Sequence, residues 1–157
     1  MPAFEIFIGY ESDVAADWAA HLKKALEKRG VRSFFDKEDI SPGNPDYRNE
    51  IDQALNEVSV FVLIWSSPGL SGEVLDEMFK ALRRFRKEGK PTILICMMVG
   101  LARSYTNVNE ALGIDTEFLQ QIDFESTKES LTRNVILFLN RNSNLIGGKS
   151  LSDRVTL

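Results

Sequence analysis

The stretch that decides the fold is residues 58–78, VSVFVLIWSSPGLSGEVLDEM. Its first eight residues are almost all apolar, which predicts a strand that is covered on both faces. A Ser/Pro/Gly turn follows, and then a helical pattern whose first turns hold three carboxylates. In open α/β sheets the ligand crevice forms at the carboxyl ends of the strands. This order therefore predicts that Glu73 and Glu77 lie close to such a crevice.

Strands and helices alternate on both sides of this stretch. Strands are predicted at 4–8, 31–35, 58–65, 92–98 and 121–124. Helices are predicted at 12–29, 47–56 and 130–139, with a further helix that carries Glu73 and runs to about Lys87, and a short irregular helix within 100–118. Units of roughly 30 residues in this order indicate βαβ crossovers. We expect an α/β fold, a flavodoxin-like three-layer α/β/α arrangement with a five-stranded parallel sheet. Residues 1–141 are expected to form one domain, and residues 142–157 a flexible polar tail.

The composition indicates a globular protein with 43% hydrophobic and 27% charged residues. The net charge of −4 is unfavourable for binding phosphate backbones, so we do not expect direct binding of nucleic acid. The cations between Lys80 and Lys90 are instead typical of the late turns of a helix. A single cysteine, no signal-peptide pattern and no membrane-length apolar run predict a cytoplasmic protein with no membrane partner.

The residue types limit the possible chemistry. The only histidine, His21, lies in the middle of a predicted helix beside two lysines, where we expect it to be solvated. A mechanism that pairs Ser or Cys with His is therefore not expected. One histidine and one cysteine, Cys96, cannot make a Cys/His zinc site, and no metal is expected. Carboxylates remain as the reactive groups.

Four segments, in this order and spacing, resemble a Toll/interleukin-receptor-type (TIR) domain of the prokaryotic NAD-hydrolase branch. The segments are Phe7-Ile8-Gly9-Tyr10, residues 35–43 (FDKEDISPG), residues 51–55 (IDQAL) and residues 66–78 (SSPGLSGEVLDEM). The resemblance covers roughly residues 3 to 140. The chain departs from the family pattern at Gly9, where a serine is common, and at Glu73, where a tryptophan is common.

The resemblance implies an enzyme that cleaves the bond between nicotinamide and ribose in NAD+, which is a substrate and not a cofactor. The catalytic glutamate of the family matches Glu77. The other residues expected around the substrate are Gly9, Tyr10, Phe35, Asp36, Trp65, Ser67 and Glu73. Trp65 and Phe35 could equally belong to the core. The alternative for Glu77 is a solvated side chain on the helix, or an ion pair with Arg83 or Arg84.

The resemblance also implies self-association through the polar loop after the second strand. The residues expected to take part are Asp39, Ile40, Ser41, Pro42 and Gly43. A homo-oligomer or filament, a separately encoded sensor or effector, and a role in antiphage defence would follow. Two other functions remain open from the sequence: a TIR scaffold without catalysis, and a nucleoside deoxyribosyltransferase-like enzyme.

Overall fold

The computed structural model describes residues 4–10, 13–35, 47–66, 72–99, 119–148 and 151. Within these residues the strands are β1 (Ile6–Tyr10), β2 (Ser33–Phe34), β3 (Val60–Trp65), β4 (Thr92–Met98) and β5 (Leu119–Phe124). The helices are α1 (Asp13–Lys28), α3 (Tyr47–Glu57), α4 (Gly72–Glu88), α6 (Lys128–Arg141) and the 3-10 helix η3 (Ser143–Ile146). The irregular helix predicted within 100–118 lies outside the described residues.

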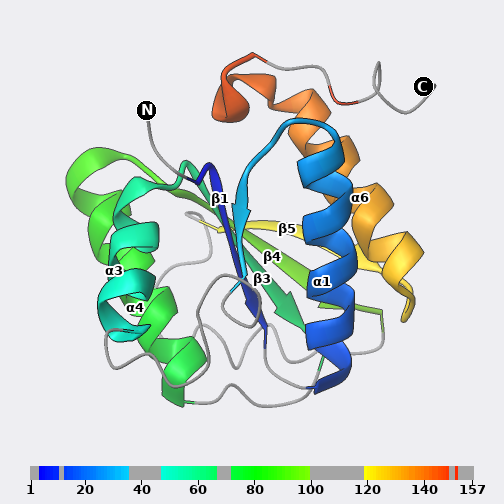
Figure 1. Cartoon of the computed structure of the whole chain (residues 1–157), viewed down its shortest axis with the longest axis horizontal. Coiled ribbons are helices and arrows are strands. Elements are labelled where there is room, and N and C mark those ends of the chain that lie inside the picture. Colours follow the sequence, from blue (N-terminus) through cyan, green and yellow to red (C-terminus); the bar gives the residue numbers. More distant parts are fainter. Residues whose placement is uncertain are drawn as a thin grey trace.

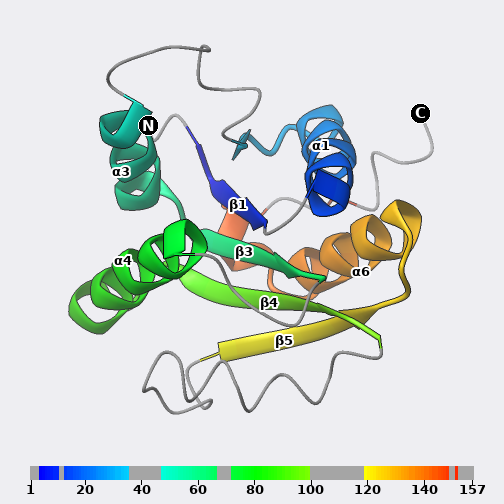
Figure 2. The same ribbon diagram turned by 90° about the horizontal axis from the view of Figure 1, so that it is seen from below.

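The five strands form one parallel sheet with the order β2-β1-β3-β4-β5. Ile6 on β1 pairs with Val60 on β3, which in turn pairs with Thr92 on β4. Helices α1 and α6 cover one face of the sheet, and α3 and α4 cover the other (Figures 1 and 2). The predicted fold class, a three-layer α/β/α arrangement around a five-stranded parallel sheet, is confirmed.

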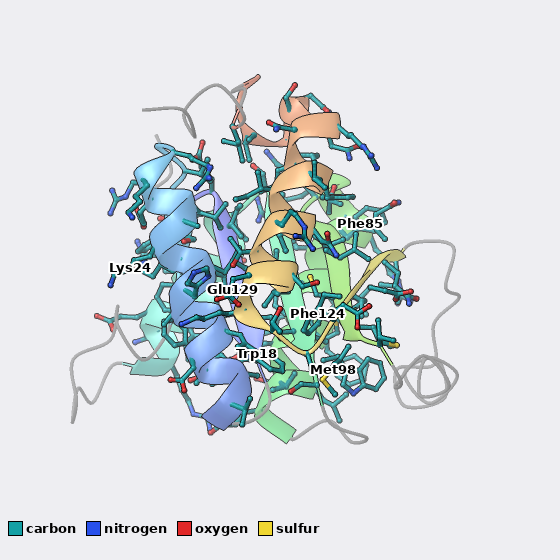
Figure 3. All side chains as sticks on the ribbon, turned by 90° about the vertical axis from the view of Figure 1, so that its right-hand side faces the viewer. Trp18, Lys24, Phe85, Met98, Phe124 and Glu129 are labelled. Atoms are coloured by element: carbon teal, nitrogen blue, oxygen red, sulfur yellow. The ribbon has the colours of Figure 1, made fainter. Side chains whose placement is uncertain are left out.

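The core is divided by the sheet into two apolar clusters, which explains the continuous apolar run of β3. Successive side chains of a strand point to opposite faces. Val62 and Ile64 therefore pack with α1 and α6, whereas Phe61 and Leu63 pack with α3 and α4. On the first of these faces the ring of Trp18 meets that of Phe124 edge-on, with centroids 5.5 Å apart (Figure 3).

The boundaries of four strands differ from the predicted ones, and the first difference is that β3 begins at Val60 rather than at residue 58. β2 has only two residues, although Val31 and Phe35 on either side of it are buried as a strand would require. Burial of an apolar side chain does not require its backbone to pair with a neighbouring strand, so the apolar pattern overestimates the length of this strand. β1 begins at Ile6, later than predicted, and β5 begins at Leu119, earlier than predicted.

The start of the predicted flexible tail is packed against the domain. Ile146 at the end of η3 and Leu151 are both fully buried in the cluster under α1 and α6. The backbone N–H of Leu151 also donates a hydrogen bond to Asn140 Oδ1 at 2.6 Å. Ile146 and Leu151 are separated by two glycines, a lysine and a serine, so they form no periodic apolar pattern in the sequence. The domain boundary at residue 141 stays a prediction.

His21 is half-buried between two helices, which corrects the expectation that it is solvated. Its Nδ1 lies 2.9 Å from the hydroxyl oxygen of Thr132 on α6. Its setting is therefore the contact between α1 and α6.

Among the described residues, no helix has both the length and the apolar character needed to cross a bilayer.

Candidate active site

A cleft of about 380 Å³ lies between the first turns of α3 and α4. Its volume is near the lower end of the range for small-molecule sites, about 300–1,000 Å³. Both helices begin at the edge of the sheet where the parallel strands end (Figure 1), which is the edge where ligands bind in open α/β sheets. The described residues that line the cleft are Arg48, Ile51, Asp52, Gly72, Glu73, Asp76, Glu77 and Lys80.

Glu77 is directed toward the end of β1. A Cβ atom added to Gly9 would lie 3.5 Å from Glu77 Oε1 and 3.4 Å from the ring of Phe61. The carboxylate therefore lies over a residue that has no side chain, at the sheet edge and beside the cleft. Glu77 is half-buried, so the expectation of a freely solvated side chain does not describe it.

Arg84, one of the two ion-pair partners that the sequence left open for Glu77, is engaged elsewhere. Its Nη1 donates to the carbonyl oxygens of Leu55 at 2.9 Å and Val58 at 2.6 Å. Its Nε donates to Glu88 at 2.7 Å. These contacts join α4 to the last turn of α3, where helix carbonyls lack partners within the helix. Arg84 therefore fixes the spacing of the two helices that form the cleft.

Lys80 bridges the cleft as a paired cation. Its Nζ lies 2.6 Å from Asp52 on α3 and 3.1 Å from Asp76, one turn earlier on α4. The hydrogen bond to Asp52 is the main cause that raises the pKa of Lys80, and the bond to Asp76 adds to it against the opposing effect of burial. Lys80 thus keeps its charge, and it holds two of the carboxylates of the cleft in ion pairs.

The aromatic residues expected to contact the substrate separate into two groups. Trp65 and Phe35 are 1% and 2% exposed and belong to the apolar clusters, which is the alternative that the sequence left open. Neither residue offers a free ring face in this arrangement. Tyr10 is half-buried and meets Phe35 edge-on, with centroids 5.2 Å apart. Since Tyr10 follows Gly9 at the end of β1, it is the aromatic candidate that keeps an accessible part near the site.

The remaining predicted site residues are placed as follows. Glu73 is exposed and lines the cleft one turn before Glu77 on α4. Asp36, Ser67 and the predicted self-association residues 39–43 lie outside the described residues. Gly9 is buried beneath Glu77.

Sequence reasoning missed the residues of α3 in the cleft, and the pairing of Lys80. The spacing of Asp76 and Lys80, four residues apart on a helix, is the signal that could have indicated their ion pair. Nothing local indicates that Asp52 lies opposite Lys80, because that contact depends on how α3 packs against α4. In the part of the chain that the structure describes, no three His, Cys, Asp or Glu side chains are arranged to hold a metal ion.

Comparisons with known proteins agree with this architecture. The structure is similar to the TIR domains of the activated Roq1 resistosome directly recognizing the pathogen effector XopQ, with a TM-score of 0.53, 19% identity, and coverage of 83% of this chain and 82% of that one. It is also similar to a metazoan TIR-STING receptor from C. gigas in complex with 2',3'-cGAMP, with a TM-score of 0.60 and 17% identity over 85% of this chain. This chain covers 40% of the receptor.

These identities are low enough that the two structures inform on the fold alone. No curated protein sequence matches this chain. A family model described as TIR domain, however, matches residues 6–136, which is most of the sequence. The chain therefore belongs to the TIR domain family.

Proposed function

We propose that this TIR domain is an NAD+ nucleosidase in which Glu77 is the catalytic residue. The observation that supports this most strongly is the position of the Glu77 carboxylate, 3.5 Å from the place of a Gly9 side chain, at the carboxyl edge of the sheet and on the wall of the cleft. A carboxylate in such a position can face the ribose of a bound nucleotide.

The chemistry needs little more than this carboxylate. Nicotinamide in NAD+ is a cationic leaving group, so the electron pair of the N-glycosidic bond moves to the ring nitrogen and neutralises it. Positive charge then develops on the ribose, as in glycoside hydrolysis. A fixed carboxylate stabilises that charge and accepts hydrogen bonds from the ribose hydroxyls. Water adds at C1′ and loses a proton to give ADP-ribose, or an adenine nitrogen adds instead to give a cyclic product.

Self-assembly is proposed as the switch for this activity. The family resemblance implies association through the loop that contains residues 39–43, and a role in prokaryotic antiphage signalling beside a separately encoded sensor or effector. The similar fold in the activated Roq1 resistosome belongs to TIR domains within an assembly. Activity that rises more steeply than protein concentration would support this switch. Specific activity that is constant with concentration would contradict it.

The test is release of nicotinamide from NAD+ by the full chain, measured in dilute and concentrated protein. The variant Glu77→Gln keeps the size of the side chain and removes its charge, and should lose roughly 100- to 1,000-fold in kcat. The matched control is Glu129→Gln on α6, on the opposite face of the sheet (Figure 3), which should keep full activity. Glu73→Gln tests whether the neighbouring carboxylate contributes.

Other outcomes of this test distinguish the remaining functions. Full activity of Glu77→Gln would remove the assignment of the catalytic residue. A wild-type chain that self-associates but releases no nicotinamide at any concentration would be a TIR scaffold. Turnover of a deoxynucleoside, with NAD+ left intact, would indicate a deoxyribosyltransferase-like enzyme.

A further inference from the structure

A second hollow, of about 480 Å³, continues the cleft along the later turns of α3 and α4. Asp52 and Lys80 line both hollows, so the two meet at this ion pair. The other residues that line the second hollow are Leu55, Asn56, Arg83, Arg84, Lys87 and Glu88. The space between α3 and α4 is therefore a groove with two halves, of which the catalytic proposal uses only the first.

The charge of the groove reverses from one half to the other. Four carboxylates and two cations line the half that contains Glu77. Four cations and two carboxylates line the second half. The sequence from Lys80 to Lys90 holds six cations and one carboxylate, although the whole chain has a net charge of −4. This segment is thus a strongly basic patch on an otherwise acidic protein.

Two of these cations are available to a ligand. Lys80 is held by its two aspartates, and Arg84 by Glu88 and two carbonyl groups. Arg83 and Lys87 are exposed, lie one turn apart on α4, and form no ion pair with any residue that the structure describes. Complementing the helix dipole does not account for both, since the effect is confined to the last turn and Arg83 precedes it.

We propose that Arg83 and Lys87 bind the diphosphate of the dinucleotide substrate in this second hollow. This inference rests on the proposed function, and it adds the direction in which the substrate lies along the groove. Arginine binds phosphate oxygens in a bidentate manner, and lysine binds them as a point charge.

The spacing along α4 suits this direction. In NAD+ one ribose separates the bond that breaks from the diphosphate. Arg83 follows Glu77 by six residues, a rise of roughly 9 Å along the helix, and its long side chain can reach back toward the cleft. The cationic pyridinium then faces Glu77 while the anionic diphosphate faces Arg83 and Lys87. The reverse direction would place the diphosphate against the carboxylates of the first half.

Binding of ADP-ribose to the full chain tests the inference without catalysis, because this probe has the diphosphate and lacks the pyridinium. The variant Arg83→Gln/Lys87→Gln should weaken ADP-ribose binding at least about tenfold, as expected for loss of charged contacts to phosphate. The matched control is Arg86→Gln/Lys90→Gln, which removes the same charge from the same segment but from residues that do not line the groove. The control should bind ADP-ribose as the wild type does. Melting temperatures would show that both variants are folded.

Kinetics separate this inference from the proposed function. With NAD+ as substrate, Arg83→Gln/Lys87→Gln should raise KM by a similar factor and leave kcat near the wild-type value, which is the mark of uniform binding. A wild-type chain that binds ADP-ribose through these residues but releases no nicotinamide would refute the function and keep the hollow as a diphosphate site. The opposite result is a protein that releases nicotinamide but whose two double variants bind ADP-ribose with equal affinity, whether or not that affinity is below the wild-type value. That result would overturn the inference and leave the proposed function standing.

Discussion

Replacing Arg84 with alanine should destabilise the domain by roughly 3–4 kcal/mol. The side chain is 10% exposed, and its guanidinium donates to the carbonyl oxygens of Leu55 and Val58. Hydrogen bonds from a charged donor contribute about 1.5–3 kcal/mol each. Two such bonds at the lower end give roughly 3 kcal/mol. The contact with Glu88, which is 52% exposed, adds about 0.3–0.5 kcal/mol as an i,i+4 ion pair.

Urea unfolding followed by circular dichroism measures this loss as a lower midpoint with an unchanged m-value. Arg84→Lys should lose about half as much, since an ammonium group can reach only one of the two carbonyl groups well. The control is Arg83→Ala, the adjacent exposed cation, which should change the free energy of unfolding by no more than about 0.5 kcal/mol. Equal losses in the two alanine variants, or a loss below about 1 kcal/mol in Arg84→Ala, would refute the assignment of Arg84 as the tie between α3 and α4.

Three further predictions concern the cleft and the core. Removing the Lys80–Asp52 pair by Lys80→Met should cost at most about 1 kcal/mol near pH 8, because both groups are partly exposed. Since folding raises the pKa of Lys80, this difference from the wild type should be constant from neutral pH up to the ordinary pKa of 10.5 and should disappear as pH rises past the raised value; urea titrations at several pH values in this alkaline range would detect a different trend. Burial raises the pKa of the Cys96 thiol, so iodoacetamide at pH 8 should label Cys96 only after unfolding, and rapid labelling of the folded protein would contradict its buried position. Trp65→Ala should lower the free energy of unfolding by about 3–5 kcal/mol, because it leaves a cavity. Gly9→Ala should change it by less than about 1 kcal/mol, because the added methyl group meets its neighbours only at ordinary contact distances. Thermal unfolding of the two variants side by side would reveal a clash at position 9.

The fold could be predicted because its signals are local and repeated. The apolar run of β3 reports burial on both faces of the sheet, and the helix that follows it begins after a Ser/Pro/Gly turn. The position of Glu77 at the carboxyl edge follows from that order alone. The boundaries of β2 could not be predicted, since Val31 and Phe35 are as buried as strand residues although the strand itself is only Ser33–Phe34.

The rest of the site depends on contacts between elements that are distant in the sequence. Asp52 becomes part of the cleft only because α3 packs beside α4 and places it against Lys80. Trp65 is a residue type that often stacks on ligands, but it lies at a core position. The alternation of side chains along β3 directs it into the apolar cluster under α3 and α4. The burial of His21 likewise depends on a distant element, because its partner Thr132 is on α6, which packs beside α1.

The strand order has a consequence for how the chain reaches its folded state. β1 lies in the interior of the sheet, yet its partner β3 is made only after β2 and α3, so the pairing of Ile6 with Val60 must close a long loop. Parallel sheets with such distant pairings fold slowly. Gly9 and Glu77 are brought together by the same closure, and neither is near the other in a partly synthesised chain. A chain released before α4 therefore lacks the site altogether, and recovery of the site during refolding would report that the first and third strands have docked.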